Sequence, residues 1–231
     1  MLSDLLYSLK EIEFFFNLFG YISFRSGLSL VTSFFIVIIL MPHWIRFQKS
    51  IFPSGQPIRN DGPDTHYRKK GTPTLGGVLI LFSIILSSIL WTSNFSSFNY
   101  ILILTLTLFG LIGLVDDFQK VKLGKGISSK TKFLSQLLAT LIIYFTIKYN
   151  GFDLNKFSIP FLKDVSIELG YLYFVLILFI VVGSTNATNL TDGLDGLVSM
   201  PLIFVFLTFA IFAYVLGNIN FSDYLLVNYM K

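Results

Sequence analysis

Two adjacent aspartates, Asp116 and Asp117, directly follow a long apolar stretch of the chain. Their mutual repulsion raises the free-energy cost of ionising both, and a bound cation offsets that cost. Mg²⁺ suits such a pair, because it prefers oxygen ligands and usually binds one or two protein carboxylates together with phosphates. On a continuing helix, Lys120 lies one turn beyond Asp116, where it can pair with the acid or bind a phosphate. The alternative is a solvated helix end with an ordinary ion pair.

A second group of polar side chains recurs every three residues, at Asn186, Asn189, Asp192 and Asp195. On a helix, residues three apart are neighbours, so this spacing predicts a continuous polar strip. Asn supplies hydrogen-bond donors and acceptors, and Asp supplies anionic oxygens. Gly193 and Gly196 would let a ligand approach the backbone closely. The alternative is a polar loop that caps the next helix, although one cap needs one such residue rather than four.

A third segment, Arg59–Gly77, places basic residues directly before a Gly/Thr/Pro stretch that opens the next apolar run. A helix that begins there can bind anions through its free backbone N–H groups, and the Lys69–Lys70 pair adds positive charge. The glycine and lysine spacing of a Walker phosphate-binding loop is absent. The alternative is a basic anchor followed by a turn into the helix.

These polar groups interrupt a chain that is otherwise strongly apolar. Of its 231 residues, 54% are hydrophobic and 13% are charged, about half the roughly 25% of soluble domains. Residues 71–115 and 196–222 contain no Asp, Glu, Lys or Arg, and the chain has no Cys. Soluble, disordered and disulfide-stabilised classes are therefore excluded, and the unbroken apolar runs exclude an outer-membrane barrel. We predict an all-α, polytopic helical membrane protein with one domain over residues 1–231.

Six stretches have the roughly 20 mainly apolar residues that a membrane-crossing helix needs, at about residues 18–41, 74–91, 100–115, 133–147, 169–182 and 197–216. Most of the 17 Lys and Arg residues fall in the connections after the first and third stretches. Positively charged loops stay in the cytoplasm, although contact with anionic lipid heads is an alternative role for them. We therefore predict that the N-terminus lies outside and that all three polar segments are cytoplasmic. That arrangement favours Mg²⁺-assisted chemistry on phosphate esters.

Four motifs in this order resemble those of the phospho-N-acetylmuramoyl-pentapeptide transferases, which are bacterial polyprenyl-phosphate sugar-phosphate transferases. The motifs are Arg59–His66 (RNDGPDTH), Gly71–Gly77 (GTPTLGG), Val115–Asp117 and Asn189–Gly196 (NLTDGLDG). The resemblance implies transfer of phospho-N-acetylmuramoyl-pentapeptide from its UDP derivative to undecaprenyl phosphate, with lipid I and UMP as products. It also implies Mg²⁺ as cofactor, a role in peptidoglycan synthesis and a place in the bacterial cell membrane.

Matched position by position, the resemblance implies roles for individual residues. Asp116, Asp117 and Asp192 would be catalytic, with Asp116 as a candidate activator of the lipid phosphate and Asp117 and Asp192 as candidate Mg²⁺ ligands. Substrate-binding residues would be Lys70, Thr74, Lys120, Lys132, Asn186, Asn189, Gly193, Leu194 and Asp195. The implied partners are the UDP-linked substrate, undecaprenyl phosphate and membrane lipid, with no nucleic acid. A second copy of the chain is a further candidate partner.

The number of spans differs between this chain and the family it resembles. The family has ten spans, so we expect six spans to correspond to its N-terminal part. A further aspartate and a His-rich loop of the family have no counterpart here, and we expect little transferase activity from these 231 residues alone. Two alternatives remain: a related UDP-N-acetylhexosamine:polyprenyl-phosphate phosphotransferase, and a transporter whose acids line a cation path. A transporter would show acids near mid-membrane and an internal repeat, and the sequence indicates neither.

Overall fold

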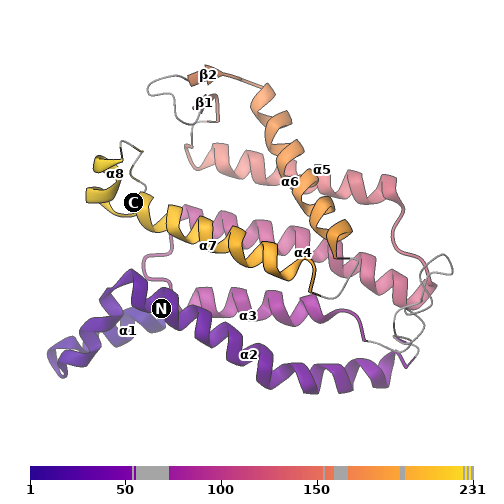
Figure 1. The fold of residues 1–231 in the computed structure, drawn as a ribbon, viewed down its shortest axis with the longest axis horizontal. Coiled ribbons are helices and arrows are strands. Elements are labelled where there is room, and N and C mark those ends of the chain that lie inside the picture. Colours follow the sequence, from indigo (N-terminus) through magenta and orange to yellow (C-terminus); the bar gives the residue numbers. More distant parts are fainter. Residues whose placement is uncertain are drawn as a thin grey trace. The chain divides into compact units, whose positions relative to one another are not determined.

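Helices form nearly all of the regular structure in the computed structural model, which describes residues 1–53, 55, 73–152, 154–158, 166–192, 196–225, 227 and 229 (Figure 1). The helices and strands are α1 (Leu2–Ser8), the 3₁₀ helices η1 (Leu9–Glu11) and η2 (Phe14–Gly20), α2 (Ile22–Ile51), α3 (Gly76–Trp91), α4 (Ser97–Leu123), α5 (Ser129–Tyr149), β1 (Lys156–Ser158), β2 (Ser166–Glu168), α6 (Leu172–Thr191), α7 (Ser199–Leu216) and α8 (Ile219–Tyr224). The chain divides into two compact units, Met1–Phe174 and Val175–Lys231.

Long apolar helices confirm the prediction of a helical membrane protein. Within the described residues, α2, α4, α6 and α7 are long and apolar enough to cross a membrane, and α3 is a shorter apolar helix. A helix also lies over each of the six predicted ranges, including α5 over residues 133–147. Which of these helices cross the bilayer, and whether they do so as one domain, stay predictions.

Three helices continue past the apolar stretches that predicted them. The first predicted stretch ends at residue 41, but α2 continues to Ile51. Likewise, α4 continues from residue 115 to Leu123, and α6 continues from residue 182 to Thr191. Backbone hydrogen bonding does not require apolar side chains, and Lys, Gln and Arg have good helix propensity. Asp116, Asp117 and Lys120 therefore stand on the last turns of α4, and Asn186 and Asn189 stand on the last turns of α6.

Within the first unit, α2 and α3 pack against each other through small and polar side chains. Ser83, which is fully buried, lies with its Oγ 3.1 Å from the Oγ of Ser33. Farther along the pair, the Trp91 Nε1–H donates to Thr32 Oγ1 at 2.9 Å. Small side chains let helices approach closely, and side-chain hydrogen bonds join them where lipid offers no partner. This pairing fixes the position at which α3 begins relative to the end of α2.

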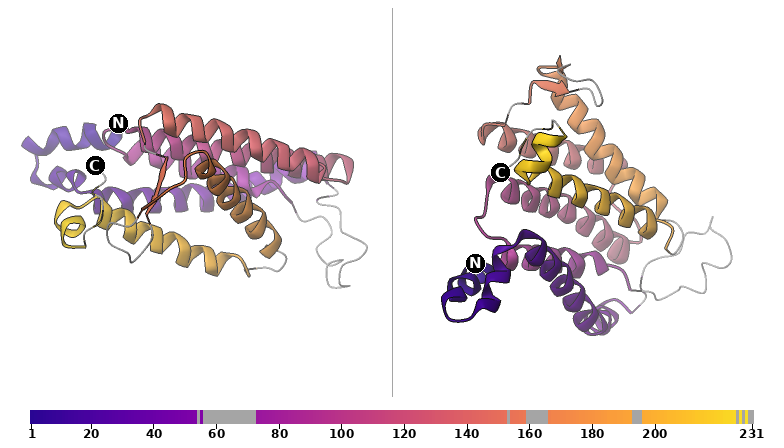
Figure 2. Two further views of the ribbon diagram at one scale, coloured as in Figure 1. Left: turned by 90° about the horizontal axis from the view of Figure 1, so that it is seen from above. Right: turned by 60° about the vertical axis from the view of Figure 1, so that its left-hand side comes forward.

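The helices of the first unit alternate in direction, so different helix ends gather at each of its two ends. The end of α2, the start of α3, the end of α4 and the start of α5 lie together at one end (Figure 1). At the other end lie the N-terminal helices, indigo in Figure 2, where α1 contacts η2 and η2 contacts α2. There Phe19 stacks on Trp91 with 6.0 Å between ring centroids. Asp116 and Thr74 belong to the first of these ends.

A short β-hairpin is the one strand pair among the described residues, and the sequence analysis did not anticipate it. Lys156–Ser158 pairs antiparallel with Ser166–Glu168, with Phe157 opposite Ile167. Each strand has three residues, too few to show an alternation of polar and apolar side chains. The hairpin follows α5, at the end of that helix opposite to Ser129.

Candidate functional site

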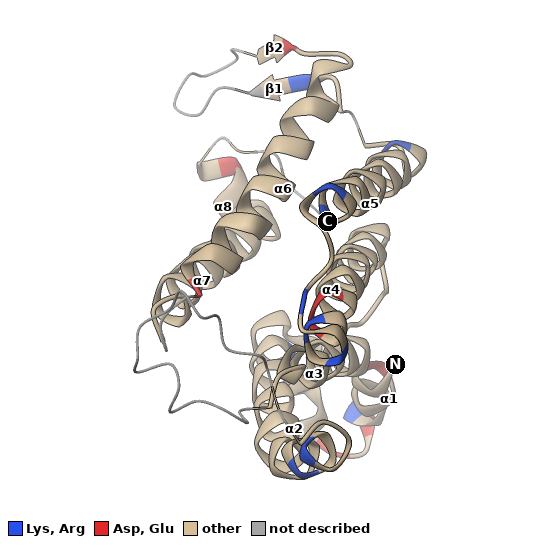
Figure 3. Ribbon diagram, turned by 90° about the vertical axis from the view of Figure 1, so that its right-hand side faces the viewer, with Lys and Arg blue, Asp and Glu red and all other residues tan. Residues whose placement is uncertain are grey.

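The last turns of α4 place two adjacent carboxylates in different surroundings. Successive side chains of a helix point about 100° apart, so one aspartate faces the protein while its neighbour faces outward. Only 10% of the Asp116 side chain is exposed, compared with 38% of the Asp117 side chain. Seen from this end, the acidic residues of α4 lie beside lysines of the same helix (Figure 3).

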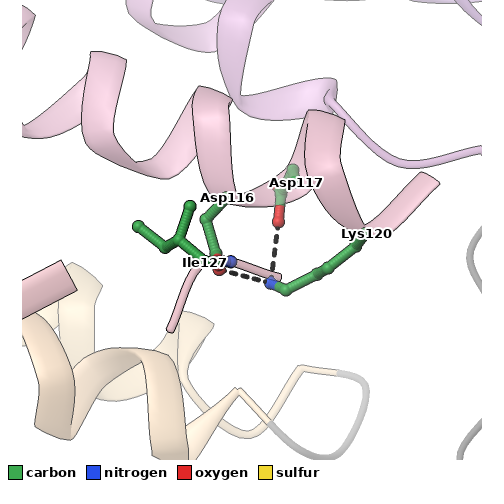
Figure 4. A network of polar contacts seen from close by, with 4 residues as sticks. All are labelled: Asp116, Asp117, Lys120 and Ile127. Carbon is green, nitrogen blue, oxygen red and sulfur yellow. Dashed lines mark hydrogen bonds and ion pairs between the residues drawn. The ribbon is translucent and has the colours of Figure 1, made fainter. Parts of the chain in front are cut away.

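Both oxygens of Asp116 have a partner (Figure 4). Its Oδ1 accepts a hydrogen bond from the Ile127 backbone N–H at 2.9 Å, and its Oδ2 lies 2.7 Å from Lys120 Nζ. A buried carboxylate is stable only with such compensation. The contact holds the connection between α4 and α5 against the last turn of α4.

Two glycines allow the chain to make that return. α4 ends where Gly124 adopts a φ of +73°, a left-handed conformation that glycine adopts without steric penalty. At Gly126 a Cβ would overlap Asp116 Oδ1 and lie 3.2 Å from Lys120 Cε. The absence of a side chain at Gly126 therefore allows the Ile127 N–H to reach the buried carboxylate.

Lys120 joins the two aspartates. Its Nζ lies 2.7 Å from Asp116 Oδ2 and 3.0 Å from Asp117 Oδ1. The structure thus shows the ion pairing that helical spacing predicted, extended to the second acid. An ammonium group has three N–H donors, so one remains for a phosphate oxygen.

Asp117 is the carboxylate better placed to meet a ligand. Its ion pair with Lys120 is made through Oδ1, and more than a third of the side chain is exposed. In the part of the chain that the structure describes, no cluster of three or more His, Cys, Asp or Glu could hold a metal. Asp117 nevertheless fits Mg²⁺, because this ion commonly takes one or two protein carboxylates and completes its shell with phosphates and water.

The predicted polar strip lies in the second unit, at the end of α6. Asn186 and Asn189 stand on the last turns of the helix, and Asp192 follows it directly. The Asn186 Nδ2 donates to the Val182 carbonyl at 2.9 Å, while Asn189 and Asp192 are exposed. The three-residue spacing is thus helical as far as Thr191, so both asparagines lie on one helix face.

The remaining predicted residues are distributed as follows. Thr74 is half-buried and lies two residues before α3, and Lys132 is half-buried in the first turn of α5. Ser128 caps that turn, its Oγ accepting from the Thr131 backbone N–H at 3.2 Å. The other predicted residues, Lys70, Gly193, Leu194 and Asp195, lie outside the described residues.

The parts played by residues 126 and 127 do not follow from the side-chain patterns of the sequence. Ile127 acts through its backbone N–H, which no side-chain pattern could reveal. The glycines at 124 and 126 were the available signal, because two glycines so close together after a helix often mark a tight return of the chain.

Comparison with known proteins places these residues in a family. Residues 99–230 match the model of glycosyl transferase family 4. The phospho-N-acetylmuramoyl-pentapeptide-transferase of Rickettsia prowazekii (strain Madrid E) is 40% identical over 217 residues, and that of Rickettsia felis (strain ATCC VR-1525 / URRWXCal2) is 40% identical over 219 residues. Each match covers 93% of this chain and 60% of the relative. The chain thus spans less than two thirds of the length of these relatives.

The two aspartates should differ in their effect on stability. Asp116→Ala leaves the half-buried Ile127 N–H without its partner and removes one of the two ion pairs of Lys120, so we expect the free energy of unfolding to fall by about 1–3 kcal/mol. Asp117→Ala removes one partly exposed ion pair and should change it by about 1 kcal/mol at most. Denaturant unfolding of the detergent-solubilised chain measures both values. Equal losses for the two variants would contradict the assignment of Asp116 as the structural carboxylate.

Proposed function

The chain belongs to glycosyl transferase family 4, and on that premise we propose that it transfers phospho-N-acetylmuramoyl-pentapeptide from its UDP derivative to undecaprenyl phosphate. The products are lipid I and UMP, and the process served is peptidoglycan synthesis. The main support is the end of α4, where an ion-paired, buried Asp116 holds an accessible Asp117 beside Lys120. The names of the two Rickettsia relatives support the choice of substrate.

The proposed reaction exchanges one phosphoanhydride bond for another. An oxygen of the lipid phosphate attacks the sugar-linked phosphorus of the UDP derivative, and the bond from that phosphorus to UMP breaks. UMP leaves with the electron pair of the broken bond. Most of the catalytic work in such a transfer is positioning and stabilising negative charge.

Each residue of the α4 end has a part in that work. Lys120 is proposed to offer its remaining donor to a phosphate oxygen, and the accessible Asp117 to bind the cation that accompanies the phosphates. The contacts of Asp116 favour a positioning role for it, since both of its oxygens already have partners. Lys132, Asn186, Asn189 and Asp192 are proposed to bind the nucleotide substrate, as are Lys70, Thr74, Gly193, Leu194 and Asp195.

A divalent cation is part of the proposal, with Asp117 and Asp192 as its candidate protein ligands. When bound, Mg²⁺ would neutralise charge that develops on the phosphoryl oxygens. The half-exposed carboxylate of Asp117 and the exposed carboxylate of Asp192 supply the oxygen donors that this ion prefers.

The proposed location is the bacterial cell membrane, where the apolar tail of the lipid substrate is buried. The three polar segments face the cytoplasm, because the nucleotide substrate is made in water and the basic connections follow the positive-inside rule. The N-terminus lies outside.

Release of UMP tests the proposed reaction. We expect release from UDP-N-acetylmuramoyl-pentapeptide, dependent on undecaprenyl phosphate and Mg²⁺, by a chimera that fuses this chain to the part of the Rickettsia prowazekii relative left uncovered by the match. Asp117→Asn and Asp192→Asn should each lower the rate about a hundredfold or more, because the amides lack the negative charge. Membrane insertion should be unchanged in both.

Asp223→Asn in α8 makes the same substitution away from these segments and should keep the wild-type rate. Release from UDP-N-acetylglucosamine alone would favour the related hexosamine-phosphate transferases instead. Near-normal rates in both the Asp117 and the Asp192 variant would refute the proposed site.

The absence of cysteine allows a direct test of orientation. Asn94→Cys and Lys125→Cys place single thiols on exposed residues of the connections after α3 and α4. A membrane-impermeant maleimide applied to intact spheroplasts should label Asn94→Cys, and it should label Lys125→Cys only after the membrane is opened. The reverse pattern would show that the proposed orientation is inverted.

A further inference from the structure

A small hollow of about 10 Å³ lies where the end of α2 meets the residues before α3. The described residues that shape it include Gln48, Phe52, Thr74, Leu75 and Val121. A volume of this size is close to the least that admits a single water-sized oxygen. The hollow can therefore receive one ligand oxygen while the rest of a ligand stays outside.

Gln48 brings an unmatched donor to this hollow. Only 5% of the residue is exposed, and its Nε2 is buried with no hydrogen-bond partner among the described residues. Buried side-chain donors nearly always have an acceptor, and an amide nitrogen can only donate. The Gln48 amide nitrogen therefore lacks an acceptor oxygen, and the hollow that Gln48 helps to line has room for one.

The other polar groups around the hollow also favour an acceptor-rich ligand. α3 begins at Gly76, and the first N–H groups of any helix have no partner within it. The Leu75 carbonyl already accepts from Trp44 Nε1 at 3.2 Å and from the Val78 N–H at 3.3 Å. Thr74 adds a hydroxyl, and none of the described residues around the hollow is acidic. Together with the positive end of the helix dipole, these donors select an anionic oxygen.

The hollow adjoins the carboxylate pair through α4. Val121 lies one turn beyond Asp117 and directly after Lys120 in the sequence, so residues of one helix border both the hollow and the ion pairs. Phe52 meets Phe118 edge to face, with 6.0 Å between ring centroids, which holds the end of α2 against α4.

We propose that Gln48 is a substrate-binding residue whose amide donates a hydrogen bond to a phosphoryl oxygen entering this hollow at the start of α3. The inference rests on the proposed function, which brings two phosphoryl groups to the end of α4. The oxygen belongs either to the phosphate of the lipid acceptor or to the diphosphate of the nucleotide donor, and binding to each distinguishes the two.

Gln48→Leu removes the donor and replaces the amide with an apolar side chain that is one atom shorter. In nanodiscs holding the 231-residue chain, dissociation constants are measured for undecaprenyl phosphate and, separately, for UDP-N-acetylmuramoyl-pentapeptide with Mg²⁺. We expect the variant to bind one of the two about 10- to 100-fold more weakly, as fits the loss of one hydrogen bond to a charged group. The ligand that loses affinity identifies the source of the oxygen.

Thermal unfolding separates a binding role from a structural one. Because Leu replaces a donor without a partner, Gln48→Leu should unfold no earlier than the wild type. Gln119→Leu makes the same substitution at a half-buried position of α4 and should leave both affinities unchanged.

Unchanged affinities for both ligands in Gln48→Leu would overturn the proposal. If that variant also unfolded at a lower temperature than the wild type, the hollow would be the site of a structural water. A wild-type chain that binds neither ligand would contradict both the proposed function and the role of Gln48. Wild-type binding that Gln48→Leu leaves intact would contradict the role of Gln48 alone.

Discussion

Charge compensation at Asp116 is the interaction on which the candidate site depends. A carboxylate with so little exposure, at the end of an apolar helix, is stable only when both of its oxygens have donors. The Ile127 N–H and Lys120 supply them, and in doing so they hold the connection to α5 and orient the lysine. Asp117, the next residue, is left as the carboxylate that a ligand can reach. The buried charge of Asp116 thus orients Lys120 and leaves Asp117 accessible.

The membrane explains how well the fold could be predicted. A span must contain about 20 apolar residues, so long uncharged runs such as residues 71–115 indicate helices without reference to any other protein. The ends of those helices were harder to predict, because α4 continues through Asp116 and Lys120 on backbone hydrogen bonds that hydropathy does not report. The hairpin at Phe157 and Ile167 is too short to show a strand pattern.

The candidate site could be predicted only where side chains carried the signal. The spacing of Asp116 and Lys120 predicted the helical end of α4, and the spacing of Asn186 and Asn189 predicted that of α6, although the helix ends before Asp192. The donor from Ile127 belongs to the backbone, and Gln48 is a single amide in an apolar helix with no regular spacing to distinguish it. Their parts follow from packing between segments distant in sequence, which periodicity within one segment cannot reveal.

Chemical modification tests the division of labour between the two aspartates most directly. A water-soluble carbodiimide with an amine nucleophile reacts with accessible carboxylates, and tandem mass spectrometry distinguishes modification at Asp116 from that at Asp117. The account predicts modification at Asp117, reduced by Mg²⁺ with the nucleotide substrate, and little at Asp116. Equal or greater modification at Asp116 would show that its carboxylate is not the buried, fully paired group on which the site is built.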